Sequence, residues 1–451
     1  MNRSNIIALM AFLFFPTLNF AQPSSALDDY IKEGLKNNIV LQQKKISYEK
    51  AEYTLKSATS LFFPSVSLIA GYTHGEGGRN ISIPVGDLMN PVYQTLNQLT
   101  NSNSFPQIQN VEESFFPNKF YDAKIRASMP LLNTDIIYNR QIQNGQLQIK
   151  EYKVEMYKKE LVKEIKTAYY NYLSSLDAVK IYSSTMELAK EAKRINESLL
   201  KNGSGLQVHV LRAESEMENL KAHLLEAETK SVSAKKYFNF LLNKNLDSPV
   251  NIETTLDEAE SPDSENDLMT IREEIKMLNQ GVEINESLLN MNKFFWIPKI
   301  SGFVDLGAQD SNWKYNQKSR YHLFGVQLEV PLFEGFRNSN KIESAELDLR
   351  DAKLELQKTT SALSLALSIA KDELQTAKQN YVSAQKQLKT AQSYNKLIDK
   401  GYLEGVNSFI ETVDARNQLT SALLLVNINK LKMLVALANY ERETSSIKIN
   451  N

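Results

Sequence analysis

Two carboxylates close together in the second half of the chain are the strongest candidates for chemistry. Glu411 and Asp414 follow a glycine-containing turn, Gly401 to Gly405, and stand three residues apart in a segment predicted to be helical. Side chains at that spacing lie on one helix face. If copies of the chain met around an axis, these acids would form a ring that attracts cations. On the residues alone a solvated acidic face is the simpler interpretation, and both stay open.

No other residues suggest an enzyme. The chain has no nucleotide-binding glycine loop after a strand, no HExxH motif, no Gly-x-Ser-x-Gly elbow and no cysteine. His209 and His223 lie about 21 Å apart along one predicted helix, which is too far to share a metal. We therefore expect no catalytic residue, no metal site and no cofactor.

Charge and hydropathy exclude two further classes. The 52 basic and 53 acidic residues are evenly mixed, so the net charge of -1 offers no basic surface for nucleic acid. A mean hydropathy of -0.37 excludes a helical protein with many membrane spans. The apolar stretch from Ile6 to Leu18, which precedes Ala21, predicts a cleaved secretory signal.

The elements that position the two acids occur twice in the sequence. Each copy has two β-like segments, the second of which ends at a proline, then a very long helix, a glycine turn and a returning helix. From Pro130 to Ala213 is 83 residues in the first copy, and from Pro331 to Ala415 is 84 residues in the second. The sequence therefore predicts two long antiparallel helical hairpins of matching length.

The long helix of the second copy carries a seven-residue repeat. From Phe336 to Lys400 it contains neither glycine nor proline, and at 1.5 Å per residue it would extend about 100 Å. A sustained repeat of seven keeps one seam against a partner only if helices supercoil. The alanines of the seam indicate close helix approach, although the helix propensity of alanine explains them equally well. The seam is Ile342, Leu349, Leu356, Leu363, Ala370, Ala377, Ala384, Ala391 and Ile398.

Four segments alternate between apolar and polar side chains, as β-strands do. One apolar and one charged face over about ten residues is typical of a membrane barrel strand, and the alternative is the edge of a soluble sheet. Roughly eight strands are the smallest barrel with a filled interior, so four cannot close in lipid. A membrane-spanning form must therefore be oligomeric, and three copies would supply twelve strands. The apolar sets begin at Val66, Tyr121, Ile300 and His322.

The predicted organisation follows from these elements. The polar segment from Gly77 to Asn118 is long enough to be an exposed loop with local structure of its own. A helix is expected at about 25–60, before the first strand. The expected boundaries are a signal peptide at 1–21; a first structural repeat at 22–250, with strands at about 65–76 and 119–130 and a helical hairpin at 133–248; an acidic linker at 251–266; and a second repeat at 267–451, with strands at about 299–308 and 320–331 and a hairpin at 336–445.

After the signal peptide, the whole chain resembles the TolC-type outer membrane efflux proteins, also called outer membrane factors. The most specific part is Gly405 to Ala415, which is similar to the family's glycine, small hydrophobic residues, acid and Val-x-Asp-Ala pattern at the periplasmic helix tip. The resemblance implies a mainly α fold with a membrane β part. It implies a homotrimer whose 12-stranded transmembrane β-barrel, four strands per chain, continues into an α-barrel tunnel. The tunnel would open when a periplasmic adaptor, or membrane fusion protein, and an inner membrane pump dock.

The resemblance also implies roles for residues at the tips. Glu411 and Asp414 match the family's pore-constricting acids, and Tyr402 matches a tyrosine that helps to hold the tip closed. The chain departs from the best-known members at Asn407, where they have an arginine, and at His209, where they have an aspartate. We therefore expect a latch of hydrogen bonds, weaker than a salt-bridge network. Adaptor contacts are expected at Gly203, Gly205, Leu206, Gly401 and Gly405.

The expected function is passive export across the outer membrane. The chain would be the exit duct of a tripartite efflux or type I secretion system, with its helices extending into the periplasm. A soluble periplasmic coiled-coil adaptor or scaffold is the alternative, and it explains the helices but not the four alternating segments. The sequence does not specify whether drugs, metal ions or proteins are exported.

Overall fold

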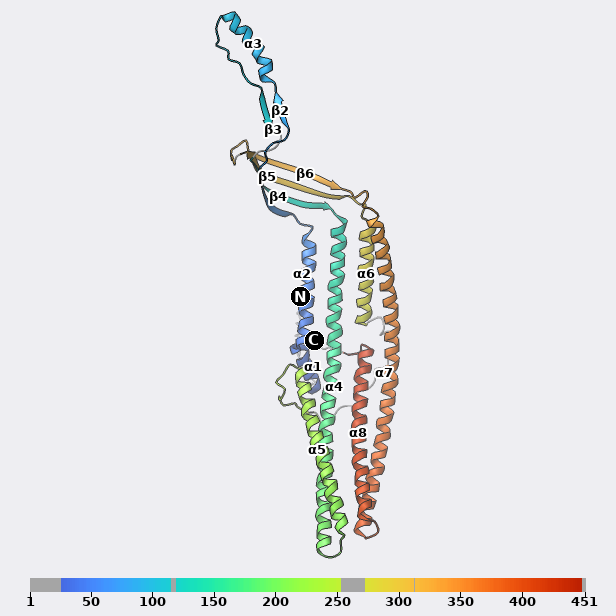
Figure 1. The fold of residues 1–451 in the computed structure, drawn as a ribbon. Helices are drawn as coiled ribbons and strands as arrows, with labels where there is room; N and C mark the ends of the chain where they lie inside the picture. Colours follow the sequence, from blue (N-terminus) through green and yellow to red (C-terminus); the bar gives the residue numbers. More distant parts are fainter. Residues whose placement is uncertain (1–25, 115–118, 253–271, 312, 448–451) are drawn as a thin grey trace, which may run out of the picture. The chain divides into compact units, whose positions relative to one another are not determined.

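The computed structural model describes residues 26–114, 119–252, 272–311 and 313–447 (Figure 1). The expected signal peptide and most of the expected acidic linker lie outside these residues. The chain forms two compact units, one from residues 1–48, 150–278 and 355–451 and the other from residues 49–149 and 279–354. Each unit combines segments of both sequence repeats, so the units cut across the duplication.

The same succession of elements is found in both repeats. The first contains α1 (Ala26–Asn37), α2 (Ile39–Ser60), β1 (Ser65–Thr73), β4 (Phe120–Leu132), α4 (Thr134–Lys201) and α5 (Gln207–Leu241). The second contains α6 (Glu273–Lys293), β5 (Lys299–Ser311), β6 (Arg320–Glu329), α7 (Arg337–Leu403) and α8 (Phe409–Glu443). Between β1 and β4, the segment expected to be an exposed loop forms β2 (Asn80–Ile83), α3 (Val85–Thr100) and β3 (Val111–Ser114).

The prediction of a single helix at about 25–60 is wrong, because the helix is interrupted at Asn38, between α1 and α2. The Asn38 side chain accepts a hydrogen bond from the N–H of Leu41 at 3.0 Å and donates one to the carbonyl of Leu241 at 3.1 Å. Asparagine favours such side-chain-to-backbone bonds over a helix interior. The break therefore ties the start of α2 to the end of α5.

In the unit that contains residues 1–48, an aromatic core holds α1 against the first hairpin, α4 and α5. Tyr30 of α1 meets Phe238 of α5 edge to face, with ring centroids 5.1 Å apart, and Phe238 lies 5.6 Å from Tyr169 of α4. Gly34 allows this approach, because a Cβ at that position would overlap the side chains of Ile165 and of the residue after α5. Burial of such rings contributes most of the stabilisation in a small core.

The predicted seam is the face that α7 buries. Every one of its nine residues is buried or half-buried, while most of the helix is exposed. Ala370 and Ala384 are 6% and 1% exposed, and Ala370 packs in a cluster with Ala436 and Tyr440 of α8. In Figure 1, α7 and α8 run antiparallel to their shared turn, as do α4 and α5. Small seam residues such as Ala370 therefore lie at the contact between α7 and α8.

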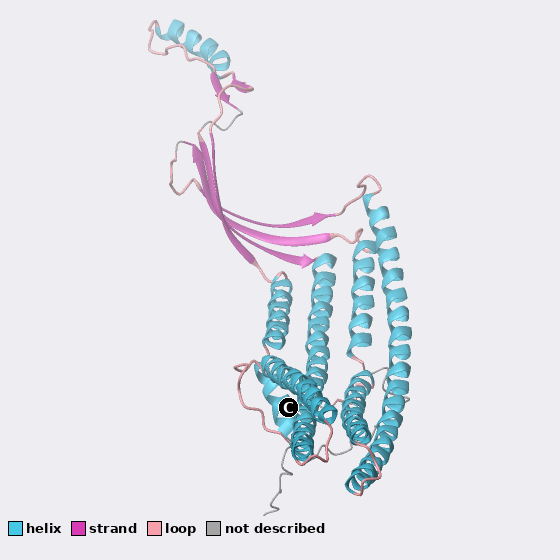
Figure 2. Ribbon diagram, turned by 60° about the horizontal axis from the view of Figure 1, so that its bottom comes forward, coloured by secondary structure: helices cyan, strands magenta, loops and turns pink. Residues whose placement is uncertain are grey.

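β1, β4, β5 and β6 form one antiparallel sheet in that spatial order, which Figure 2 shows as a strongly twisted ribbon. The central pairing of β4 with β5 joins the two repeats. The register places Leu68 opposite Ile125 and Ile125 opposite Leu306, so the apolar sets share one face. The sheet is open, and among the described residues β1 and β6 each have one side without a strand partner.

The two faces of the sheet differ sharply. On the polar face, Arg126 donates two hydrogen bonds, of 2.7 and 2.6 Å, to Asp305, whose side chain is 1% exposed. The guanidinium also lies 4.8 Å from the centroid of the Phe303 ring. The apolar face is uncovered. Its residues, between 46% and 80% exposed, include Val66, Leu68, Ile125, Val304, Leu306, Phe324, Val326 and Leu328.

A buried charge network fixes the end of α8 to the start of α6. Arg272 donates to the carboxylate of Glu443 at 2.7 Å, and Arg442 donates to Glu274 at 2.6 Å. Burial alone would raise the pKa of Glu274, but hydrogen bonds from Arg272 and Arg442 outweigh it and lower that pKa to about 2. The carboxylate is therefore ionised at neutral pH and holds two arginines from separate elements.

Replacing Glu274 with Gln should destabilise the fold at neutral pH and flatten its acid dependence. Because the folded-state pKa of about 2 lies below the ordinary 4.5, the carboxylate stabilises the fold above about pH 5, and this contribution is lost as the pH falls towards 2. A shift of this size corresponds to roughly 3 kcal/mol. Thermal denaturation of the purified protein across this pH range measures it, with Glu283→Gln, an exposed position on α6, as control. Equal pH slopes for wild type and Glu274→Gln would contradict the assignment.

Candidate functional site

The first hairpin turns through a glycine in the left-handed region. Gly203 has a φ of 74°. Its N–H bonds the carbonyl of Leu200 at 3.0 Å, and the N–H of Ser204 bonds the carbonyl of Leu199 at 2.9 Å. This is a Schellman motif, which satisfies the last carbonyls of a helix and favours glycine because a left-handed backbone is strained for residues with a Cβ.

The second hairpin turns through the same motif. Gly405 has a φ of 76°. Its N–H bonds the carbonyl of Tyr402 at 3.1 Å, and the N–H of Val406 bonds the carbonyl of Gly401 at 2.7 Å. The two expected tip segments are therefore equivalent turns, and α5 and α8, which follow them, both contain 35 residues.

In each tip the end of the long helix lies close to the chain just after the turn, and a glycine makes room for this contact on a different side in each repeat. In the first tip a Cβ on Gly205 would lie 2.6 Å from the backbone nitrogen of Leu200 and 2.9 Å from the Cβ of Leu199. In the second, a Cβ on Gly401 would lie 1.9 Å from the Oδ1 of Asn407. Gly401 is the counterpart of Leu199, and Asn407 is the counterpart of Gly205. In the first tip the side chain at the close approach is that of Leu199, and its partner is a glycine. In the second tip the side chain is that of Asn407, at the other position, and the partner is again a glycine.

Glu411 closes the start of α8. The hydroxyl of Ser408 accepts a hydrogen bond from the N–H of Glu411 at 3.3 Å, and the N–H of Ser408 donates to the Glu411 carboxylate at 2.6 Å. This is a capping box. The bond from the Ser408 backbone, with further bonds from the side chains of Ser408 and Asn407, lowers the pKa of Glu411. At the start of α5, Leu206 provides no side-chain cap, so the second tip is the better-capped one.

Asp414 lies on the same helix face as Glu411. Both side chains are exposed, and Asp414 accepts a hydrogen bond from Gln418, one turn further on, at 2.9 Å. Neither acid has a basic partner among the ion pairs of the described residues. A single chain therefore presents an open acidic face, and a ring of acids would require other copies.

The structure gathers two of the expected gate residues around a third residue, Phe409. The ring of His209 lies 5.3 Å, and that of Tyr402 6.3 Å, from the Phe409 ring. Phe409 is 2% exposed and packs in a cluster with Ala213 and Val413. The cluster joins the two hairpin tips, and burial raises the pKa of Tyr402. The sequence assigned Phe409 no role, although a large aromatic residue directly after a capping serine was the available signal.

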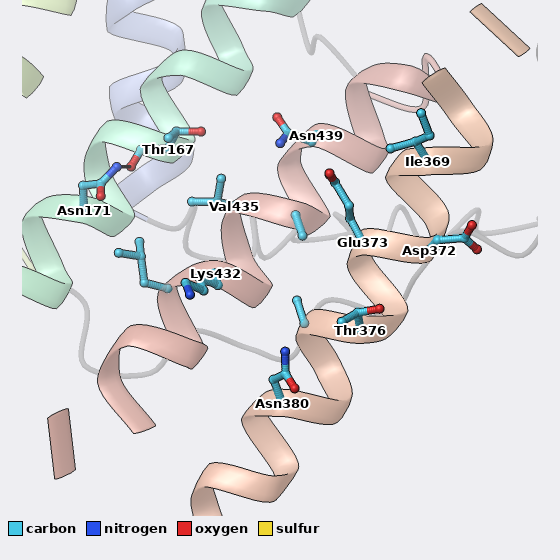
Figure 3. Close-up of a pocket in the computed structure, with 13 residues that line it drawn as sticks. Thr167, Asn171, Ile369, Asp372, Glu373, Thr376, Asn380, Lys432, Val435 and Asn439 are labelled. Carbon is cyan, nitrogen blue, oxygen red and sulfur yellow. Dashed lines mark hydrogen bonds between the residues drawn. The ribbon is translucent and has the colours of Figure 1, made fainter. Parts of the chain in front are cut away.

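A separate cavity of about 670 Å³ lies between α4, α7 and α8 (Figure 3). Side chains from all three helices line it, with amides such as Asn171 and Asn439 and the charged Glu373 and Lys432. No histidine, serine or cysteine nucleophile is among its lining residues. Within the described residues, no group of three or more His, Cys, Asp or Glu side chains is placed to hold a metal.

Comparisons with known proteins bear on the same features. The profile of the outer membrane efflux proteins matches residues 30–243 and 267–440. Similar solved structures include the outer-membrane channel OprN (TM-score 0.77, 16% identity, 93% of this chain and 89% of that one) and the CmeC outer membrane channel of Campylobacter jejuni (0.77, 16%, 93% and 85%). The open state of the MtrE outer membrane channel of Neisseria gonorrhoeae is also similar (0.73, 13%, 93% and 88%). At these identities the likeness concerns the fold. No curated protein matches significantly.

Exchanging the side chains at the close approach tests the equivalence of the tips. Gly401→Leu should loosen the second turn by about 1–3 kcal/mol, because the new side chain meets Asn407. Adding Asn407→Gly copies the arrangement of Leu199 and Gly205 and should restore the turn. Amide hydrogen exchange in the last turn of α7 measures both, and Leu403→Ala, at an 83% exposed position, is the control. A double variant as loose as the single one would rule out the equivalence.

Proposed function

The chain belongs to the outer membrane efflux protein family, and on this premise we propose that three copies of it join into one channel with a barrel of twelve strands, four from each copy. The family consists of outer membrane channels, so the chain is an exit duct for efflux.

The observation that carries the proposal is the open sheet with an uncovered apolar face. In lipid, the unpaired N–H and C=O groups of β1 and β6 would have no water to bond, at several kcal/mol for each group. If β6 of one copy pairs with β1 of the next, every edge acquires a partner. Around a symmetry axis such head-to-tail contacts close into a ring. The apolar face then meets lipid and the face of Arg126 and Asp305 lines the lumen.

Neighbouring residues on β1 test this arrangement. Arginine in place of Leu68 would stand in lipid, at a cost of roughly 2–4 kcal/mol near the midplane, whereas arginine in place of Ser67 would face the lumen. We expect Leu68→Arg to abolish the membrane-inserted oligomer and Ser67→Arg to preserve it, as measured by membrane fractionation and by native mass in detergent. Both positions are exposed in the single chain, so a soluble scaffold would tolerate both substitutions equally, and that result would overturn the channel.

The two hairpins of each copy would form one third of the tunnel wall. A hydrogen bond between the hydroxyls of Thr185 and Thr420, and one from Asn427 to the carbonyl of Ser174, already join α4 to α8. α8 has the length and hydropathy of a membrane span and is only partly buried. Its bonds to α4 and its capped, tip-forming start support a place in the wall, where neighbouring copies would cover its remaining apolar surface.

The gate would lie at the tips. Three copies of Glu411 and Asp414 would constrict the pore with six carboxylates, whose charge attracts cations. Tyr402, Asn407 and His209 would form the latch, with the hydrogen bond from Asn407 to Glu411 and the rings around Phe409 in place of salt bridges.

Neutralising the acids without removing their hydrogen bonds tests the constriction. Glu411→Gln with Asp414→Asn keeps polar groups at the cap of α8 and at Gln418, so the tip should stay folded. In planar bilayers this variant should show several-fold weaker block by divalent cations than the wild type, because the attracting charge is gone. Glu404→Gln, an exposed acid in the same turn, serves as control. If divalent cations block the double variant as strongly as the wild type, the two acids do not form the constriction.

Adaptor contacts would fall on the two tips, around Gly203, Gly205, Leu206, Gly401 and Gly405. Large apolar side chains stand uncovered there, with Leu206 61%, Leu403 83% and Val406 78% exposed. A cavity of about 910 Å³ lies between α7 and α8 further along the same hairpin. A periplasmic adaptor with an apolar contact surface fits these features. The duct itself is passive, and an inner membrane pump would supply the energy and choose the substrate.

A further inference from the structure

The segment between β1 and β4 contains a helix with one face fixed to its own chain. Asn90 and Asn97 of α3 each exchange two hydrogen bonds with the backbone of the returning segment, Asn90 with Ile108 and Asn97 with Phe105, at 2.7 to 3.0 Å. Gly86 lies against the same segment, since a Cβ there would be 2.5 Å from the carbonyl oxygen of Ile108. One side of α3 therefore packs against the returning segment of its own chain.

The opposite side of α3 is an exposed apolar stripe, which no part of the chain that the structure describes covers. Leu88, Val92, Thr95 and Leu99 are spaced by four, three and four residues, which is the seam spacing of a coiled coil. Leu88, Val92 and Leu99 are 70%, 50% and 79% exposed. The hydroxyl of Thr95 is satisfied inside the helix by the carbonyl of Pro91 at 2.9 Å, so Thr95 does not interrupt the apolar character of the stripe.

Charge distinguishes between a lipid surface and another copy as the partner of this stripe. Helices that lie on membranes carry lysine and arginine along their polar face, whereas α3 has no basic residue and a single acid, Asp87, which is bonded to Asn110 at 2.9 Å. The stripe itself bears no charge. Identical uncharged stripes can meet at a symmetry axis without repulsion, so a second and third copy of α3 suit it best.

The position of α3 in the chain also favours other copies. The segment leaves directly from β1, the edge strand that pairs with the neighbouring copy in the proposed barrel. A barrel of twelve strands spaced about 4.8 Å apart and tilted by about 40° has a radius of about 12 Å. At 1.5 Å per residue α3 alone is about 24 Å long, so the three helices are long enough to reach the axis.

We propose that the three α3 helices of the assembled channel pack along the stripe of Leu88, Val92, Thr95 and Leu99 into a short three-helix seam over the outer mouth of the duct. The inference rests on the proposed trimer. Its occupant is a second copy of this chain, and its consequence is a closure at the outer end that is independent of the periplasmic tips.

A single cysteine tests the seam, since the chain has none of its own. In the purified detergent-solubilised oligomer, Leu99→Cys should cross-link under oxidation or with a short bis-maleimide. About two thirds of the chains should run as covalent dimers, because three thiols around one axis allow one bond. Gln94→Cys, which is exposed on α3 but off the stripe, should remain monomeric and react fully with a monofunctional maleimide.

Each outcome decides the matter. A trimer by native mass in which Leu99→Cys stays free and reacts as readily as Gln94→Cys overturns the seam and leaves the channel intact. Cross-linking of Leu99→Cys to another protein in cells also overturns it and identifies a different occupant. Absence of a trimer overturns the proposed function and the seam together. Selective dimer formation at Leu99 in a native trimer supports the seam.

Discussion

A β-sheet that faces lipid cannot have free edges, and the rest of this structure depends on that constraint. The chain supplies four strands whose central pairing, β4 with β5, joins the two halves of a duplicated sequence. The pair of Arg126 and Asp305 fixes those strands to each other on the polar face. In the proposed channel a single chain is therefore only a part: its sheet has one apolar and one polar face, but four of the twelve strands.

The two hairpin tips, one from each repeat, share a backbone conformation but differ in their side-chain chemistry. Both turns end in a left-handed glycine with the same pattern of N–H bonds. The second is capped by Ser408 and Glu411 and exposes acids, while the first has no side-chain cap and contributes His209. Phe409 is buried between the tips, so the two turns form one structural unit although some two hundred residues separate them in the sequence.

The features that sequence predicts well are periodic ones. The repeat, the hairpin lengths, the strand faces and the seam of α7 depend on spacing along one element. The break at Asn38, the fixed face of α3 and the cluster around Phe409 depend on contacts between distant segments, such as Asn38 with Leu241, and no local pattern contains them. Glu411 is an intermediate case. Its expected role was that of a pore acid alone. The Ser408-x-x-Glu411 spacing is a capping signature, and in the structure the carboxylate also accepts the hydrogen bond that closes the start of α8.

The opposite placement of glycine in the two tips has a consequence for how the halves can evolve. A repeat copied from one half to the other by unequal crossing-over within the turn would bring together either two large residues or two glycines. In the first combination a leucine such as Leu199 faces an asparagine such as Asn407, and the two side chains clash. In the second a glycine such as Gly401 faces a glycine such as Gly205, which leaves the turn without side-chain support. A crossover inside this short stretch would therefore weaken the turn that it produces, whereas exchange of a whole tip would keep each glycine with its matching partner.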